Sequence, residues 1–96
     1  MKGMVLNNNQ LMSFPREIGN LNQLGILELR NNNITSLPKE IGRLQGLVEF
    51  NLENNQLTSL PKELGKLNQL KRLSLRGNNL TPFTHGNWEN QTTEYL

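Results

Sequence analysis

The chain has 96 residues, enough for one small domain, near the size at which a single hydrophobic core is only marginally stable. Ten basic and eight acidic residues give a formal charge of +2, and because the Lys and Arg residues are scattered, this charge is weak evidence for a nucleic-acid surface. The chain contains no cysteine, which excludes disulfide frameworks, thiolate metal sites and cysteine nucleophiles.

One sequence period runs through most of the chain. Full units begin at equal intervals near Phe14, Leu37 and Leu60, and the segment Met1–Ser13 aligns with the second half of such a unit. Self-similarity at a constant interval indicates stacked supersecondary units, in which each unit buries its apolar edge against the next. A repeat array is therefore predicted to cover residues 1–82.

A short strand is predicted in each unit, where apolar and polar residues alternate. The alternation is found at 27–29, 50–52 and 73–75, with Leu or Phe at the first and third positions. A period of two places neighbouring side chains on opposite faces of a strand, so one face is expected to be buried. Stacked in register, these strands form a parallel sheet.

An asparagine follows each strand at one position of the repeat. These residues are Asn9, Asn32, Asn55 and Asn78. An asparagine side chain carries donors and an acceptor, so at a turn it can bond backbone groups of its own and the neighbouring unit that otherwise have no partner. The sequence therefore predicts a structural ladder of asparagines along the array.

The other side of each unit is predicted to be a short helical or 3₁₀ turn. The segment 37–44 consists of Leu-Pro-Lys-Glu-Ile-Gly-Arg-Leu, in which proline fixes φ near the start and apolar residues follow at three-residue steps. The glycine of this segment recurs as Gly19, Gly42 and Gly65. We expect it to let the turn end tightly.

Together these features resemble the leucine-rich repeat. The pattern Leu-x-x-Leu-x-Leu-x-x-Asn-x-Leu-x-x-Leu-Pro-x-x-Ile covers about residues 1 to 82, and its 23-residue Leu-Pro-Lys-Glu-Ile-Gly form is similar to the bacterial, spirochaete-type subclass and to plant intracellular Ras-group-related repeats. The resemblance implies an α/β solenoid, a curved right-handed coil with a parallel β-sheet on its concave face and short helical or 3₁₀ turns on its convex face. It also implies a non-enzymatic scaffold that binds other macromolecules, mostly proteins, on the concave face.

The segment 83–96 departs from the repeat. Phe83 keeps an apolar position, but Trp88 stands where the units have glycine, and Asn90 and Thr93 stand where they have leucine. This segment is interpreted either as a degenerate tail or as a cap folded over the last unit.

The solvent-facing positions of the predicted strands form the default binding surface. Partner binding on this concave face is predicted for Glu28, Arg30, Glu49, Asn51, Glu53, Arg72, Ser74 and Arg76. Because neighbouring strands lie about 4.8 Å apart, Arg30, Glu53 and Arg76 also form a ladder of alternating charge, and Glu49 stands beside Arg72. Such a ladder either only holds the register of the strands or binds a protein with the opposite charge pattern, which fits mixed signs better than a polyanion does.

A basic stripe on the predicted turns is interpreted as a solvated surface. Positions 16, 39 and 62 are Arg or Lys, but a glutamate follows each of them and cancels much of the field. Nucleic-acid binding also favours exposed aromatic side chains for stacking, whereas Phe14 and Phe50 occupy core positions. No nucleic-acid partner is expected.

No catalytic residue, metal site or cofactor is predicted. His85 is the only histidine and lies in the divergent tail, and no Asp or Cys is present to act with it. Glu28 and Glu49 have the spacing of a glycosidase pair, but an open sheet offers no apolar pocket to set one carboxyl apart as the acid. Clustered His, Cys or Asp ligands for a metal are lacking.

Two alternative functions follow from the ends of the array and from its family resemblance. A solenoid without caps exposes apolar surface and unpaired strand groups, here at the Met4–Leu6 edge, so a homodimer or larger self-association is one alternative. Recognition of a glycan or cell-surface ligand is the second, although it would favour aromatic residues on the concave face, where the strand positions have none. Without a visible signal peptide or transmembrane segment, the default expectation is a cytoplasmic protein, or a secreted or surface protein if the chain is a fragment.

Overall fold

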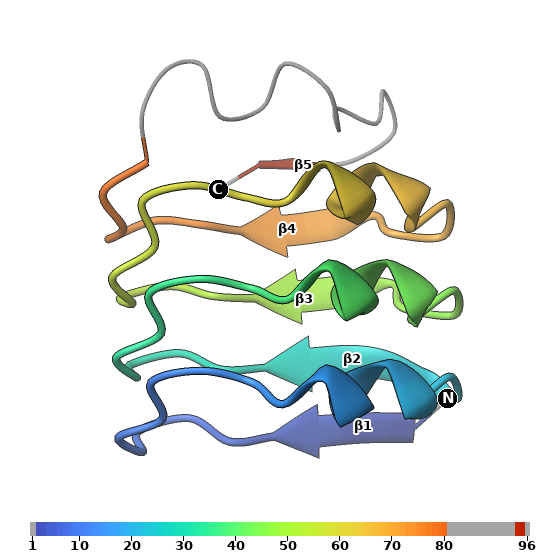
Figure 1. Cartoon of the computed structure of the whole chain (residues 1–96), viewed down its shortest axis with the longest axis horizontal. Helices are drawn as coiled ribbons and strands as arrows, with labels where there is room; N and C mark the ends of the chain where they lie inside the picture. The colour runs from blue at the N-terminus through green and yellow to red at the C-terminus, as the bar shows by residue number, and fades with distance from the viewer. Residues whose placement is uncertain (1, 81–93, 96) are drawn as a thin grey trace.

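A computed structural model describes residues 2–80 and 94–95 of the chain, and over this range the backbone forms a stack of coils (Figure 1). The strands are β1 (Lys2–Val5), β2 (Leu24–Glu28), β3 (Glu49–Asn51), β4 (Arg72–Ser74) and β5 (Glu94–Tyr95). Each of the first three strands is followed by a 3₁₀ turn: η1 (Arg16–Asn20), η2 (Lys39–Arg43) and η3 (Lys62–Lys66). We call the coils with β1, β2 and β3 the first, second and third coils.

The strands form one parallel sheet in chain order, β1-β2-β3-β4-β5, and their arrows point the same way in Figure 1. Leu27 of β2 pairs with Phe50 of β3, which pairs with Leu73 of β4. Each partner lies one repeat period further along the chain, so the repeat period of the sequence determines the register of these strands. The predicted parallel sheet with short turns is thereby confirmed.

Strand β5 is an element that the sequence pattern did not predict. Its Glu94 pairs with Arg72 and its Tyr95 pairs with Leu73, so this pairing falls one position short of the repeat period that relates β2, β3 and β4. Aligning the sequence with itself at the repeat interval therefore misses a strand whose pairing is displaced by one residue. The alternatives of tail and cap were predicted for residues 83–96, of which 83–93 and 96 lie outside the described residues.

The 3₁₀ turns begin where proline holds the chain extended. Pro15, Pro38 and Pro61 have φ of −71°, −73° and −70° and precede η1, η2 and η3. One apolar side chain of each turn, Ile18, Ile41 or Leu64, is buried. None of the helices in the described part of the chain is both long enough and apolar enough to span a membrane.

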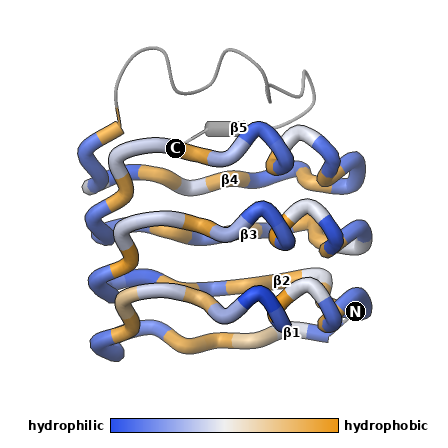
Figure 2. The backbone as a smooth tube through the Cα atoms, viewed as in Figure 1, coloured by the Kyte–Doolittle hydropathy of each residue, from blue (hydrophilic) through white to orange (hydrophobic). Residues whose placement is uncertain are grey.

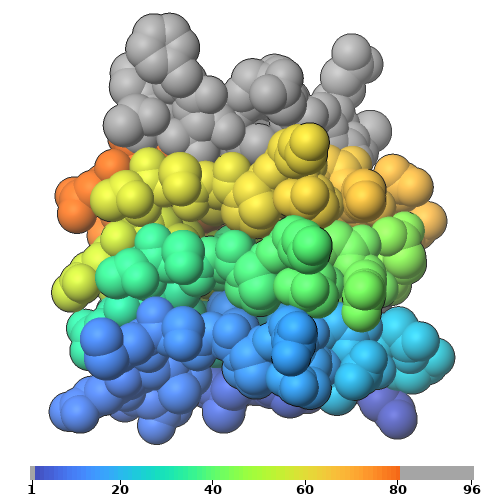
Figure 3. Space-filling view, in the orientation of Figure 1, coloured from blue at the N-terminus to red at the C-terminus, as the bar shows by residue number. Residues whose placement is uncertain are grey.

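The glycines of the turns have a different role from the one that the sequence suggested. Gly19 and Gly42 are buried, and among the described residues Gly77 is the only glycine with a positive φ. A Cβ atom at Gly42 would lie 2.7 Å from the carbonyl oxygen of Glu63, and one at Gly19 would lie 3.0 Å from that of Glu40. Glycine therefore allows adjacent turns to pack backbone against backbone, and the expectation that it ends the turn was wrong. The space-filling view shows successive coils in contact along the stack (Figure 3).

Hydrophobic residues recur at corresponding places of successive coils (Figure 2), and their buried side chains form the core. Leu29, Ile34 and Ile41 of the second coil are fully buried, as are the corresponding Leu52 and Leu57 of the third coil. The first coil is more open, because its Leu6 is 37% exposed and its Met4 and Leu11 are only partly buried. Full burial of a unit thus needs a neighbouring unit on each side.

Candidate interaction surface

The residues predicted to bind a partner come from three neighbouring strands and the loops that follow them. Glu28 ends β2, Glu49 and Asn51 belong to β3, and Arg72 and Ser74 belong to β4. The register places Glu49 opposite Arg72 and Asn51 opposite both Glu28 and Ser74. These side chains alternate with buried Leu27, Phe50 and Leu73, so they lie on the outer side of the sheet. We call this side the sheet face, and the side with the 3₁₀ turns the turn face.

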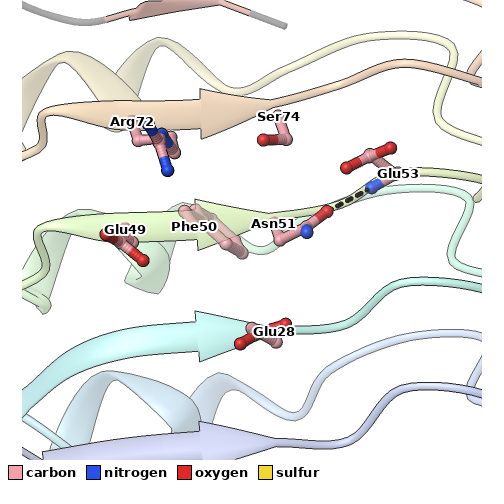
Figure 4. A pocket seen from close by; sticks show the side chains of 7 residues that line it. All are labelled: Glu28, Glu49, Phe50, Asn51, Glu53, Arg72 and Ser74. Carbon is pink, nitrogen blue, oxygen red and sulfur yellow. Dashed lines mark hydrogen bonds between the residues drawn. The ribbon is translucent and has the colours of Figure 1, made fainter.

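A hollow of about 280 Å³ lies on the sheet face, centred on β3 (Figure 4). It is lined by Glu28, Glu49, Phe50, Asn51, Glu53, Arg72 and Ser74. Six of the eight predicted residues thus meet in one place, with Phe50 of the core beneath them. Three carboxylates, one guanidinium, one amide and one hydroxyl surround the hollow.

Arg30 and Arg76, the other two predicted residues, are exposed and do not line the hollow. The backbone N–H of Asn31 donates to the carbonyl oxygen of Glu53 at 3.0 Å, and that of Asn54 donates to the carbonyl oxygen of Arg76 at 2.8 Å. These bonds align positions 30, 53 and 76 across the coils. The ladder of alternating charge therefore passes the end of the hollow, which takes in only its middle member, Glu53.

Glu53 is held beside the hollow by a hydrogen bond within its own loop. Its backbone N–H donates to Oδ1 of Asn51 at 3.0 Å (Figure 4). Glu28 accepts a long hydrogen bond of 3.4 Å from Nδ2 of Asn7. Within the described part of the chain, the carboxylates of Glu49 and Glu53 accept no hydrogen bond and form no ion pair.

Ser74 differs from its prediction as a solvent-facing side chain, because it is only 3% exposed. Its hydroxymethyl group is shorter than the side chain of Asn51, its partner on β3, which is only partly buried. It still borders the hollow, and within the described part of the chain its hydroxyl forms no hydrogen bond. No side-chain oxygen or nitrogen of the described residues is both wholly buried and without a partner. The hydroxyl of Ser74 therefore remains accessible at the floor of the hollow.

The repeated asparagine column bonds the backbone of two coils at once. Nδ2 of Asn55 donates to the carbonyl oxygens of Leu52 at 3.0 Å and of Leu29, in the preceding coil, at 2.9 Å. Its Oδ1 accepts from the N–H of Ile34 at 3.1 Å. Asn32 and Asn78 form the equivalent bonds. Asn9 is exposed and donates only within its own coil, to Leu6 and Asn7.

A second asparagine ladder lies on the surface and was not predicted from the sequence. Asn8, Asn31 and Asn54 have φ of 62°, 60° and 58°, which is the left-handed region that asparagine tolerates better than most residues. Nδ2 of Asn31 donates to Oδ1 of Asn8 at 2.7 Å, and Nδ2 of Asn54 donates to Oδ1 of Asn31 at 2.9 Å. Each of these residues directly precedes a member of the predicted asparagine column, so the Asn-Asn pairs of the sequence belong to two separate ladders.

The turn face has charges of both signs side by side. Grooves between its turns are lined by Arg16, Glu17, Lys39, Glu40, Arg43, Glu63 and Lys66, among others. This mixture supports the interpretation of a solvated surface. The described residues include no group of three or more His, Cys, Asp or Glu side chains that could hold a metal ion, and His85 lies outside them.

A parallel sheet on one side, 3₁₀ turns on the other and asparagines bonding successive coils define the chain as a solenoid of stacked repeats. The chain belongs to the leucine-rich repeat family, because its residues 3–90 match the family model described as "Leucine-rich repeat region". No curated protein sequence matches the chain. Proteins of this family commonly mediate protein–protein interactions and are typically not enzymes.

Solved structures of three relatives show the same fold. A leucine-rich repeat protein from Leptospira interrogans aligns with a TM-score of 0.94 and 38% identity, over 100% of this chain and 25% of that chain. An internalin from Listeria monocytogenes has a TM-score of 0.76 and 24% identity, over 95% of this chain and 26% of that chain. The leucine-rich repeat ectodomain of an Arabidopsis thaliana receptor kinase has a TM-score of 0.74 and 26% identity, over 96% of this chain and 52% of that chain. The chain thus spans about a quarter of the length of the two bacterial proteins.

Proposed function

We propose that the chain is a non-enzymatic protein-interaction module that binds its partner on the sheet face. The observation that supports this most directly is the hollow, where six predicted residues from β2, β3 and β4 and the loop after β3 meet around one point. A surface of this kind gives specificity through complementary charge. Among residues 2–80 the sheet face exposes no aromatic side chain, which favours a protein over a glycan as the partner.

The test compares three baits in a pull-down from a lysate and a cell-surface fraction of the source organism. The first bait is the parent chain. The second, the sheet-face variant, carries Glu28→Arg, Arg30→Glu, Glu53→Arg and Arg76→Glu. The third, the turn-face variant, carries Arg16→Glu, Glu17→Arg, Lys39→Glu and Glu40→Arg. Each variant exchanges two charges of each sign, so the net charge of all three baits is equal.

The expected result is a protein captured by the parent chain and by the turn-face variant and lost from the sheet-face variant. Circular dichroism and thermal unfolding establish that all three baits are folded. Capture that survives in the sheet-face variant contradicts the proposal, and capture lost only in the turn-face variant assigns the interaction to the turns. A photo-crosslinking residue at position 51, compared with one at position 62, then maps the contact directly.

A second candidate function is self-association through the first coil. The exposed large hydrophobic side chains of the described residues are Val5, Leu6, Met12 and Leu21, which all lie in or next to this coil. Strand β1 is also the edge of the described sheet, and edge strands offer unpaired backbone groups for pairing. Light scattering should then show a mass that rises with protein concentration and falls back in Val5→Lys. A monomeric mass at the highest concentration contradicts this candidate.

We also assign the chain to the 23-residue subclass with Leu-Pro-Lys-Glu-Ile-Gly turns and infer a bacterial origin. Support comes from the three tandem copies of this turn and from the 38% identity to the Leptospira protein. A longer sequence around this chain, with further copies at the same step, is the observation that tests the assignment.

A further inference from the structure

We propose that the hollow of the sheet face receives one cationic side chain, a lysine or an arginine, from the protein partner. This inference rests on the proposed function, because it names the chemistry by which the sheet face recognises its partner. It depends on the charges around the hollow, on a hydroxyl at its floor, on its open shape and on the charges at its rim.

The charges around the hollow favour a cation. Glu28, Glu49 and Glu53 contribute three carboxylates, whereas Arg72 contributes the single guanidinium. Two of the carboxylates, those of Glu49 and Glu53, have no hydrogen bond or ion pair within the described part of the chain, and the third has only the 3.4 Å bond from Asn7. These groups approach the hollow from β2, from β3 and from the loop after β3 (Figure 4). An added positive charge would gain charge-assisted hydrogen bonds, which are stronger than neutral ones.

Ser74 supplies an independent indication that the hollow takes a polar group. The residue is only 3% exposed, yet its hydroxyl borders the hollow and has no partner in the described part of the chain. A polar group that is largely removed from water gains more from a hydrogen-bond partner than an exposed one does. An ammonium group has three donors and no acceptor, so it can donate to this hydroxyl as well as to two carboxylates.

The open shape of the hollow suits a side chain of a partner better than a free small molecule. Small-molecule sites are mostly apolar clefts that enclose their ligand, whereas this hollow of about 280 Å³ is lined mainly by charged and polar side chains. It is an open depression on a sheet, with the buried Phe50 beneath it. The aliphatic stem of lysine or arginine can lie along such a surface while its charged end reaches the carboxylates. A metal ion is less suitable, because these residues are not among any group able to hold one in the described part of the chain.

The charged side chains near the rim of the hollow predict which residues flank the cation in the partner. Arg30 and Arg76 are exposed on either side of Glu53 in the cross-coil ladder, outside the hollow. A second positive charge next to the first would meet these guanidinium groups, and like charges across an interface are unfavourable. The partner motif is therefore one basic residue with acidic residues near it, and not a basic run.

The experiment selects peptides from a displayed random library on the folded 96-residue chain and discards those that also bind the sheet-face variant. The remaining peptides should share one Lys or Arg with acidic neighbours. Each is then synthesised in two forms, one with this residue and one with norleucine in its place, and binding is measured by fluorescence polarisation. Loss of the charge should weaken binding at least about tenfold, since one charge-assisted hydrogen bond corresponds to a factor of this size.

Variants of the chain should reproduce this difference. Glu49→Gln with Glu53→Gln should weaken the basic peptide about tenfold and leave the norleucine peptide unchanged, whereas the matched turn-face pair Glu17→Gln with Glu40→Gln should change neither. Ser74→Ala should weaken only the basic peptide, by a few-fold. All three variants keep the size of the side chain or reduce it by one atom, and thermal unfolding shows whether they remain folded.

The outcomes separate this inference from the function on which it rests. Peptides that depend on the sheet face but share no cation, or that bind equally well with norleucine, overturn the inference and leave the proposed function standing. If every selected peptide also binds the sheet-face variant, the proposed function fails, and the inference fails with it.

Discussion

The first coil and the third coil follow the same repeat pattern and differ sharply in burial. Leu6 is 37% exposed, whereas Leu52, at the same position two units later, is 0% exposed. Asn9 is exposed and bonds only its own coil, whereas Asn55 is 5% exposed and bonds two coils. The third coil has a coil on each side, and within the described part of the chain the first coil is covered only by the second.

This difference shows that the stabilising interactions of a unit come largely from its neighbours. In a stacked array, stability is approximately a sum of the stability of each unit and of the interfaces between adjacent units. The same residue should therefore contribute differently in the first and third coils. Matched substitutions in the two coils test this expectation within one chain.

The largest difference is expected between Asn55→Ala and Asn9→Ala. Removing the Asn55 amide leaves the N–H of Ile34 without its partner. The carbonyl oxygens of Leu29 and Leu52 each lose one bond but keep those from Asn32 and Asn78. Since one buried group left unsatisfied costs about 1–3 kcal/mol and each further lost hydrogen bond about 1 kcal/mol, we expect Asn55→Ala to lower the free energy of unfolding by about 3 kcal/mol. Asn9→Ala should lower it by under about 1 kcal/mol, because water replaces its bonds. Urea unfolding measures both, and equal losses would contradict the comparison.

The next difference concerns the core leucines at one repeat position. Leu52→Ala should lower the free energy of unfolding by about 3 kcal/mol, since it leaves a cavity in a packed core. Leu6→Ala should cost about 1 kcal/mol, because part of this side chain is already in water and the site can relax. Thermal unfolding of the two variants beside the parent chain checks the ratio. A Leu6→Ala loss as large as that of Leu52→Ala would show that something else covers the first coil in solution.

Gly42→Ala probes the interface between adjacent turns. The new Cβ atom would lie 2.7 Å from the carbonyl oxygen of Glu63, so the second and third coils must separate slightly, at a cost of about 1–3 kcal/mol. Gly46→Ala is the control, because its Cβ would meet the carbonyl oxygen of Leu24 at an ordinary 3.4 Å. If Gly42→Ala is as stable as Gly46→Ala in urea, the close packing of the turns does not limit stability.

These residues also show how far the sequence predicted the fold and the candidate site. A constant repeat period determines which residues stand side by side in a stack, so the columns containing Leu52, Asn55 and Glu49 followed from spacing alone. The displacement of β5 by one residue did not follow, because residues 83–96 lack the repeat pattern from which a register could be predicted. The burial of Ser74 was also missed, for a different reason. Alternation gives the side of the sheet on which a side chain lies, but not its depth among longer neighbours.

The exposed ladder of Asn8, Asn31 and Asn54 was missed because its basis is a backbone angle. A positive φ cannot be inferred from the apolar spacing, and the same position holds glycine in the next unit, where Gly77 has a φ of 81° and an added Cβ would collide with Oδ1 of Asn54. Both residue types share a tolerance for the left-handed region. The sequence signal was therefore that this one column contains only Asn and Gly, and not the polarity of that column.

The smallest expected effects lie in this ladder and separate backbone from side chain. Asn31→Ala should lower the free energy of unfolding by about 1 kcal/mol, because alanine at a φ of 60° is strained. Asn31→Gly removes the same bonds to Asn8 and Asn54 but accepts this φ, so it should cost only a few tenths of a kcal/mol. Equal losses in urea unfolding would show that the side-chain bonds, and not the left-handed backbone, select asparagine here. Asn8→Ala should then cost less than Asn31→Ala, because Asn8 belongs to the first coil and bonds only one neighbour of the ladder.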